Sequence, residues 1–279
     1  MPQYLQPGGL SEALSALARE PALAVLAGGT DFYPARVGRS LDESVLDITR
    51  ICELRGISAS GGDLRIGATT TWSEVIEADL APAFDGLKLA AREIGGRQIQ
   101  NTGTIAGNLC NASPAADGTP ALLALDARVE LASSRGVRTL ALADFAQGSR
   151  KTARAVDELV TAIIVPAWPG GARGSFIKLG ARKYLVISIV LVSAVAALDA
   201  RGAIARCGVA VGSCSAAPRR LAALEARFSG MAADAACASI RAQDLDALTP
   251  ITDVRGSADY RRDVALTLVR QALMEACRR

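Results

Sequence analysis

A short apolar run that ends in two glycines is the feature that most constrains the fold of this chain. Residues 23–26 are too few for a helix and suit a buried strand, and the segment Ala27–Asp31 (AGGTD) follows directly. Two glycines let the backbone turn sharply and approach a ligand, and successive exposed N–H groups form a nest for an anion such as a diphosphate. The segment lacks the G-x-G-x-x-G pattern, so a Rossmann dinucleotide fold is not predicted. Taken alone, such a turn is more often only a turn.

A second polar segment, residues 97–120, is crowded with Gly, Asn, Ser, Thr and Pro. We expect a long loop here, and loops of this length in a compact chain are usually functional. The loop offers backbone amides at Gly103 and Gly107, together with hydroxyl and side-chain amide groups suited to a phosphate, a ribityl chain or a ribose. Asp117 either accepts hydrogen bonds from ligand hydroxyls or caps a helix over residues 118–127, and both roles stay open.

The chain contains no histidine, which excludes several kinds of chemistry. Ser-His-Asp and Cys-His catalysis, histidine metal ligation and a flavin attached through histidine are all ruled out. Six cysteines are present, but none form a Cys-x-x-Cys pair, so neither a zinc site nor an internal iron–sulfur cluster is indicated. We therefore expect six free, mostly buried thiols, no metal ligands and no catalytic side chain.

Charge and hydropathy argue against nucleic-acid and membrane functions. The formal net charge of the 279 residues is +3, and no basic run reaches five residues, so nucleic-acid binding is not predicted. The longest apolar stretch, residues 185–198, falls short of the roughly 18 to 20 residues that span a bilayer. Because no targeting segment is visible either, we expect a cytoplasmic protein without membrane insertion.

The pattern along the chain predicts two α+β parts separated by a linker at residues 166–171 (PAWPGG). Ser11 is expected to cap the first helix, Thr69–Thr71 to cap another, and Gly95-Gly96 to end a third. Lys178 is either a phosphate or flavin ligand or a solvated lysine on a strand. The remaining predictions are strands at 45–48 and 61–68, helices within 73–94 with a break near Pro82, regular structure at 121–127 and 129–132, a hairpin of 187–198 and 204–211 turning at Asp199–Gly202, and helices at 221–228 and 258–277.

Three segments together resemble a known family. AGGTD, then IGATTT at residues 66–71, then QIQNTGTIAGNLCNASPAAD at residues 98–117, are similar to the medium, FAD-binding subunit of the xanthine dehydrogenase and CO dehydrogenase family. The family form T-I-G-G-N-x-x-x-A-S-P-x-x-D is matched by Thr104–Asp117, with Ala106 in place of one glycine. Residues 175–195 resemble the start of the family's C-terminal flavoprotein domain, so the resemblance covers the whole chain.

The resemblance implies an α+β fold with a vanillyl-alcohol-oxidase or PCMH-type FAD-binding domain. That domain would occupy residues 1–170, as two α+β subdomains of about 1–55 and 56–170. A CO-dehydrogenase-flavoprotein-like C-terminal α+β domain, a small antiparallel sheet with helices, would occupy residues 171–279. FAD would bind non-covalently, with the diphosphate and ribityl chain on the two glycine-rich segments.

The resemblance also assigns individual FAD contacts by position. Ile94 would lie against the flavin or adenine, Asp117 on the ribityl or ribose side, and Val160 beside the isoalloxazine. The resemblance favours the ligand role for Lys178, because a cation near the pyrimidine end of the flavin ring stabilises the reduced, anionic flavin. The full set is Val25, Leu26, Ala27, Gly28, Gly29, Thr30, Asp31, Phe32, Ile94, Thr104, Ile105, Ala106, Gly107, Asn108, Asp117, Val160 and Lys178.

As a family member, the chain would be an electron-transfer subunit of an oxidoreductase. It would take electrons from a small [2Fe–2S] subunit, next to a large molybdopterin subunit that oxidises the substrate, and pass them to an external acceptor. A dimer of heterotrimers is expected, and the absence of a cysteine-rich insertion argues against the subtype with an extra [4Fe–4S] cluster. Three alternatives stay open: a stand-alone FAD-dependent reductase, a non-redox nucleotide-binding module, and a scaffold whose flavin site has decayed.

Overall fold

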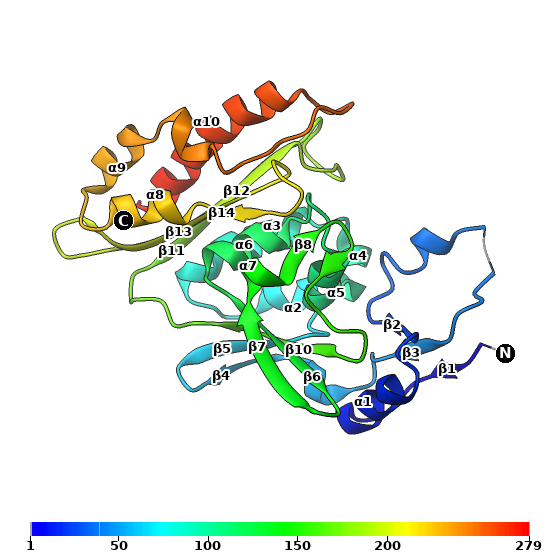
Figure 1. Ribbon diagram of the computed structural model, residues 1–279. Helices are drawn as coiled ribbons and strands as arrows, with labels where there is room; N and C mark the ends of the chain where they lie inside the picture. Colours follow the sequence, from blue (N-terminus) through cyan, green and yellow to red (C-terminus); the bar gives the residue numbers. More distant parts are fainter. Residues whose placement is uncertain (1, 39, 279) are drawn as a thin grey trace.

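The computed structural model describes residues 2–38 and 40–278, and in these ranges the chain folds into sheets with helices packed between and over them. Figure 1 shows a small N-terminal unit on one side, a five-stranded sheet at the bottom and a four-stranded C-terminal sheet at the top. No helix in the described ranges is long and apolar enough to cross a membrane.

The N-terminal unit is a three-stranded parallel sheet covered by one helix. The strands β1 (Tyr4–Leu5), β3 (Val45–Asp47) and β2 (Ala24–Leu26) lie in that order, and α1 (Leu10–Arg19) packs on them. The helix begins after Gly9, and no side chain caps it, so the prediction of Ser11 as the cap was wrong. The Glu12 carboxylate instead accepts a hydrogen bond from the Gly8 N–H at 3.1 Å. The strand at 23–26 and the helix before it are confirmed.

The five-stranded sheet is antiparallel and has the order β4-β5-β10-β6-β7. Its strands are β4 (Ile57–Ser60), β5 (Asp63–Gly67), β10 (Leu159–Val165), β6 (Arg128–Ser133) and β7 (Gly136–Ala141). The turn between β4 and β5 is Gly61-Gly62, and both glycines have positive φ, so the strand predicted within residues 61–68, entered by a Gly-Gly turn, is confirmed. The pairing of β10 with β6 shifts register between Val160 and Ala162, which marks a β-bulge.

Short helices fill the space between the five-stranded and four-stranded sheets. They are α2 (Trp72–Glu77), η3 (Pro82–Phe84), α3 (Asp85–Glu93), α4 (Arg97–Thr102), α5 (Ile105–Asn111) and α6 (Gly118–Ala124). Thr71 caps α2 with a full capping box, and Gly95 follows α3 with a φ of 57°, so both predicted helix boundaries are confirmed. The long loop predicted over residues 97–120 was wrong, because three helices of six or seven residues occupy most of it.

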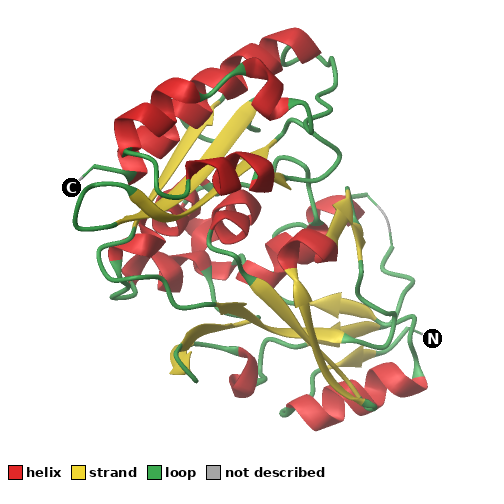
Figure 2. Ribbon diagram, turned by 60° about the vertical axis from the view of Figure 1, so that its left-hand side comes forward, coloured by secondary structure: helices red, strands yellow, loops and turns green. Residues whose placement is uncertain are grey.

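The C-terminal part is an antiparallel sheet with helices on both faces. Its strands are β11 (Arg173–Leu179), β12 (Val190–Leu198), β13 (Ile204–Gly212) and β14 (Arg219–Arg220), and the predicted hairpin between β12 and β13 is confirmed. One face packs on α3 and α6, while α8 (Ala222–Phe228), α9 (Ala233–Ser239) and α10 (Ala258–Ala276) cover the other (Figure 2). The remaining elements are η1 (Pro34–Arg36), η2 (Cys52–Leu54), α7 (Leu142–Phe145), β8 (Ala146–Gly148), β9 (Lys151–Thr152) and η4 (Ala242–Leu245).

Two hydrophobic cores hold the C-terminal sheet in place, beside a smaller one in the N-terminal unit that includes Leu17 and Leu46. One joins the five-stranded sheet, the short helices and the inner face of the C-terminal sheet, and it includes Trp72, Ile163 and Val195. The other lies between the outer face of that sheet and α8 to α10, and it includes Phe228 and Val269. Since the first core crosses from one part of the chain to the other, the C-terminal sheet is held firmly against the helices that carry the second predicted loop.

Candidate functional site

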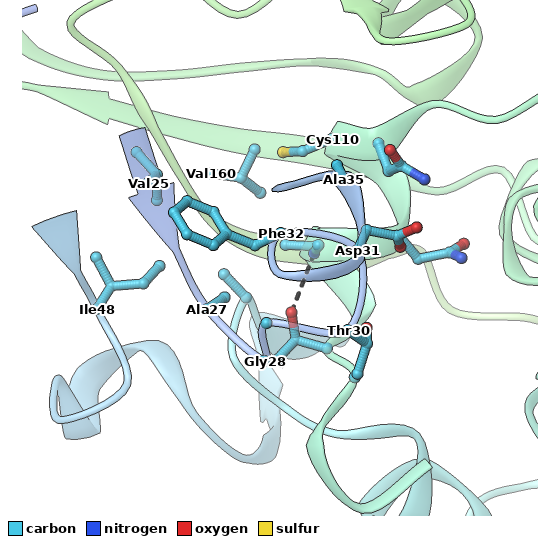
Figure 3. Close-up of a pocket in the computed structure, with 18 of the residues that line it drawn as sticks. Val25, Ala27, Gly28, Thr30, Asp31, Phe32, Ala35, Ile48, Cys110 and Val160 are labelled. Carbon is cyan, nitrogen blue, oxygen red and sulfur yellow. Dashed lines mark hydrogen bonds between the residues drawn. The ribbon is translucent and has the colours of Figure 1, made fainter. Parts of the chain in front are cut away.

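A pocket of about 560 Å³ opens where the N-terminal unit meets α5 and β10. The turn after β2 forms one wall, and Figure 3 shows Gly28, Thr30 and Asp31 on it, with Val160 and Cys110 on the opposite side. Thirteen of the seventeen residues predicted as FAD contacts line this pocket. They are Val25, Ala27, Gly28, Gly29, Thr30, Asp31, Phe32, Ile94, Thr104, Ala106, Gly107, Asn108 and Val160.

The glycines of the first turn are required by its geometry. A Cβ atom on Gly28 would collide with the carbonyl oxygen of Thr102, so only glycine lets this turn touch the α4–α5 junction. Gly29 has a φ of 73°, which side chains rarely adopt, and a Cβ there would meet the Tyr33 ring. The N–H groups of residues 28–32 donate to no acceptor among the described residues. This run of unused donors is the anion nest that the sequence predicted.

The second segment contributes side chains to the pocket, and its backbone amides are already used. The Gly103 N–H donates to the Ile99 carbonyl oxygen at 2.6 Å, and the Gly107 N–H donates to Thr104 Oγ1 at 3.1 Å. The prediction that these two amides are free for a ligand was therefore wrong. The Thr104 hydroxyl keeps its own proton for a further bond, and the buried Oδ1 atom of Asn108 has no hydrogen-bond partner in the described chain. A buried acceptor in a pocket wall fits a ligand that donates a hydrogen bond to it.

Three arginines line the same pocket, and sequence reasoning missed all of them. Arg36, Arg150 and Arg154 face a lining whose one carboxylate is that of Asp31. The Arg36 guanidinium lies 3.7 Å from the centroid of the Phe32 ring and donates to the Phe32 carbonyl oxygen at 2.8 Å, which fixes the far side of the turn. Glu43 pairs with Arg36 at 2.5 Å, and the other two arginines still outnumber Asp31, which favours an anionic ligand. Arg36 follows the first turn, and Arg150 and Arg154 flank β9 more than one hundred positions later, so no single local motif joins the three.

Apolar side chains form the rest of the lining and suit a flat ring system. Phe32 and Val25 lie close to Val160 in Figure 3, and Ile48 and Leu159 extend this surface. Val160 sits at the bulge of β10, and bulges are common beside binding sites because they redirect a side chain. The pocket thus has a polar, cationic part and an apolar part.

The other four predicted contacts do not line the pocket. Leu26 and Ile105 are buried core residues. Asp117 and Lys178 form an ion pair of 2.8 Å, and their side chains are only 10% and 7% exposed. Asp117 occupies the N-cap position of α6 as predicted, but its side chain makes no capping bond, and the alternative of Lys178 as a solvated lysine was wrong because Lys178 is buried. Ser188, which no sequence signal marked, donates to the second Asp117 oxygen at 2.6 Å.

This ion pair lies directly behind the pocket wall. Gly118 follows Asp117 and packs against Trp72 and the Oδ1 atom of Asn108, both of which belong to the lining. Burial raises the pKa of Asp117, while Lys178 and Ser188 oppose that shift by stabilising the carboxylate. The pair therefore joins the α5–α6 connection to β11 and to the residues before β12.

The lining offers no activated nucleophile. Cys110 borders the pocket, and burial raises the pKa of its thiol to about 11, so the thiol stays protonated at neutral pH. Among the residues that the structure describes, no group of three or more His, Cys, Asp or Glu side chains could hold a metal ion. What the site can do chemically is bind an anionic ligand that carries an apolar ring.

Comparisons with known proteins agree with this description. A model of the FAD binding domain in molybdopterin dehydrogenase matches residues 1–168, and one of the CO dehydrogenase flavoprotein C-terminal domain matches residues 175–276. A xanthine dehydrogenase FAD-binding subunit of Escherichia coli O157:H7 is 31% identical over 285 residues, which cover 98% of this chain and 95% of that one. The carbon monoxide dehydrogenase medium chain of Afipia carboxidovorans is 32% identical over 281 residues, covering 98% and 96%.

A solved structure matches along the whole length as well. The reconstituted CO dehydrogenase from Oligotropha carboxidovorans contains a chain with a TM-score of 0.90 and 29% identity, and the match covers 99% of this chain and 98% of that one. The fold and the pocket thus define a flavoprotein with a PCMH-type FAD-binding domain. The chain belongs to the family of FAD-binding medium subunits of the molybdenum hydroxylases, and it is an oxidoreductase subunit. The predicted fold class, family and cofactor are confirmed.

Proposed function

We propose that the pocket binds one FAD non-covalently and that the chain works as an electron relay inside a larger complex. It would take electrons from the [2Fe–2S] clusters of a small partner subunit and pass them to an external acceptor, while a large molybdopterin subunit oxidises the substrate. The observation that carries the proposal is the run of unused N–H donors at residues 28–32, in a pocket that three arginines and an apolar surface also line.

The residues of the pocket fit FAD at each of its parts. The free amides of the first turn, with Arg150 and Arg154 nearby, suit the two charges of the diphosphate. Thr104 and Asn108 offer a hydroxyl and an unpartnered amide to the hydroxyls of a ribityl chain. The surface of Phe32 and Val160 suits a flat ring. FAD supplies the two-electron redox chemistry, and the protein holds it and shields it from water.

Asp117 and Lys178 have a different part in this proposal. As an ion pair behind Trp72 and Asn108, they would fix the wall against which the ribityl chain rests and would place a buried cation near the ring.

We also propose a division into an FAD-binding domain of residues 1–170 and a C-terminal domain of residues 171–279. The expected assembly is a dimer of heterotrimers. The relatives' names mention xanthine, nicotinate, nicotine, glyceraldehyde and carbon monoxide, so the relatives differ from one another in substrate.

Reconstitution with FAD tests the binding step. The purified chain should take up one FAD per molecule and show flavin absorbance at about 450 nm. Arg150→Gln removes one pocket cation and should weaken FAD binding by about 10-fold. This is the lower end of the range for a hydrogen bond to a charged group, because the Arg150 side chain is exposed to solvent. The matched control is Arg19→Gln, an exposed arginine on α1 outside the pocket, and it should leave the affinity unchanged.

The relay role needs a separate measurement. Purification from the source organism should yield FAD together with molybdenum and iron in one complex. A stand-alone reductase would instead show steady-state turnover of a small substrate by the isolated chain. A non-redox module would bind a nucleotide that lacks the flavin chromophore, and a decayed site would take up neither ligand.

A further inference from the structure

The turn of residues 153–158, between β9 and β10, carries one of the pocket arginines. Arg154 lines the pocket proposed above for FAD, here called the FAD pocket, and Leu159 and Val160 line it just after the turn. Glu158 ends the turn, is only 5% exposed and does not line the pocket. Any effect of Glu158 on a bound ligand must therefore act through a neighbour, and Arg154 is the neighbour whose charge belongs to the pocket lining.

Three hydrogen bonds converge on the buried Glu158 carboxylate. Its Oε1 atom accepts from Arg138 Nε at 2.6 Å, and its Oε2 atom accepts from Arg138 Nη2 at 2.8 Å. Oε2 also accepts from the Ala155 N–H at 2.7 Å, while the Glu158 N–H donates to the Ala155 carbonyl oxygen at 3.1 Å. Arg138 Nη2 donates to the Ala153 carbonyl oxygen as well, at 2.9 Å. Because an arginine that bonds a carboxylate at two points has little freedom, the Arg138–Glu158 pair fixes both ends of the 153–158 turn.

The Arg154 side chain is bound to this same turn by one of its nitrogens. Nη1 of Arg154 lies 2.6 Å from the carbonyl oxygen of Glu158, 3.2 Å from that of Ala155 and 3.4 Å from that of Val156. The closed turn brings these three oxygens together, so its shape determines where the guanidinium lies. The Nε and Nη2 atoms of Arg154 donate to no acceptor among the residues that the structure describes, and they are available to a ligand in the pocket.

We propose that Glu158 is a positioning residue for FAD, and that it acts through Arg154 on the diphosphate. The inference rests on the proposed function, since it needs a diphosphate in the pocket. Held by Arg138, the Glu158 carboxylate keeps the 153–158 turn closed. The closed turn binds Nη1 of Arg154, and the two unused nitrogens of the guanidinium donate to the diphosphate oxygens. An arginine binds phosphate best when its planar guanidinium is held in one orientation, and the turn supplies that constraint before FAD arrives.

Glu158→Gln tests the proposal with almost no change in side-chain size. The amide has one acceptor oxygen where the carboxylate has two, so its NH₂ group must face a donor of Arg138 or Ala155. The turn should then open, and titration of the FAD-free full chain with FAD should show an affinity about 5-fold weaker than that of the wild type. The loss should be smaller than the loss of about 10-fold expected for Arg154→Gln, because Glu158→Gln keeps the cation but not its position.

A double variant separates positioning from a purely structural role. If Glu158 acts through Arg154, then Glu158→Gln combined with Arg154→Gln should bind FAD no more than about 2-fold more weakly than Arg154→Gln alone, because no cation is left to position. Independent effects would instead multiply to about 50-fold. Riboflavin gives a second readout, since it carries the flavin ring and the ribityl chain but no phosphate. Its affinity should change by less than about 2-fold in Glu158→Gln.

Two further variants keep the test sharp. Arg138→Gln opens the turn from its half-exposed side and should weaken FAD binding by about 3-fold, and it serves if Glu158→Gln does not fold. Arg135→Gln is the matched control, because Arg135 pairs with Asp157 of the same turn and makes no bond to Arg154 or Glu158. Arg135→Gln should leave the FAD affinity unchanged.

Three results would overturn the inference. One is an unchanged FAD affinity in both Glu158→Gln and Arg138→Gln. Another is a double variant in which the two losses multiply, since Glu158 would then act independently of Arg154. The last is a loss of riboflavin affinity as large as the loss of FAD affinity, because the phosphates would then not be involved. In all three cases the wild type still binds FAD and the proposed function stands, whereas a wild-type chain that takes up no FAD would overturn both.

Discussion

Replacement of Lys178 by methionine tests the role of the ion pair behind the FAD pocket. Methionine keeps most of the length and the apolar character of lysine but removes the charge. In the native chain the Lys178 ammonium lies 2.8 Å from Asp117, and both side chains are nearly buried. In the variant the Asp117 carboxylate keeps only its hydrogen bond from Ser188, at 2.6 Å.

Loss of one partner from a buried ion pair costs about 3–5 kcal/mol, because the other charge stays buried without compensation. We expect the lower end, about 3 kcal/mol at pH 8, because Ser188 still donates to Asp117. That corresponds to a shift of about 150-fold in the folding equilibrium. Since a domain is stabilised by only about 5–15 kcal/mol, the change should be easy to measure.

The pH dependence gives the sharper test. Burial already raises the pKa of Asp117, and loss of Lys178 should raise it further. An acid whose folded pKa lies above its unfolded pKa contributes stability below the unfolded value, and that stability is lost as pH rises through the folded value. The variant should therefore be closest to wild type at about pH 4 and should lose stability steadily toward about pH 8.

Urea unfolding followed by circular dichroism at several pH values would measure this effect. Lys151→Met, at an exposed lysine on β9, is the matched control and should change stability by less than about 0.5 kcal/mol. The double variant Asp117→Asn, Lys178→Met should recover most of the loss at high pH, because it leaves no buried charge. A loss below about 1 kcal/mol at pH 8, or an equal loss at pH 4 and pH 8, would refute the reasoning.

Three other changes have specific expected outcomes. Gly28→Val should abolish FAD uptake because its side chain would collide with the Thr102 carbonyl, whereas Gly8→Val, in open space, should leave the bound flavin absorbance unchanged. Thr71→Ala removes the capping box of α2 and should lower the free energy of unfolding by about 1 kcal/mol in urea. A hydrogen bond from Arg138 lowers the pKa of Glu158, so the Glu158 carboxylate contributes stability above its unfolded pKa, and this stability is lost as the pH falls through its folded pKa. Glu158→Gln removes this titration and should flatten the acid side of a plot of melting temperature against pH.

Features set by neighbouring residues were predictable from the sequence. The positive φ after α3 at Gly95, the capping box at Thr71 and the hairpin turn at Asp199–Gly202 all depend on a few adjacent positions. The first turn was predictable for the same reason, because two glycines after an apolar run allow few other conformations. Pairing that turn with the second segment needed the family resemblance, since the two lie more than seventy positions apart.

Features set by distant contacts could not be predicted. The helices α4, α5 and α6 have only six or seven residues each, and such lengths are unstable in isolation, so their sequences resemble a loop. Packing between two sheets stabilises them. Arg150 and Arg154 were missed because the first turn lies far from them in sequence, and Ser188 was missed because its partner Asp117 is 71 positions away.

The two glycine-rich segments have different tasks, and this explains a departure from the family pattern. The first turn exposes its N–H groups, while the N–H groups at the start of α5 already bond within the protein. Ala106 stands where the family has a second glycine, and its N–H donates to the Ala68 carbonyl oxygen at 3.2 Å. The methyl group therefore adds apolar surface to the pocket without removing a donor. Small residues should therefore be accepted at position 106 and large ones should not, whereas position 28 must stay glycine.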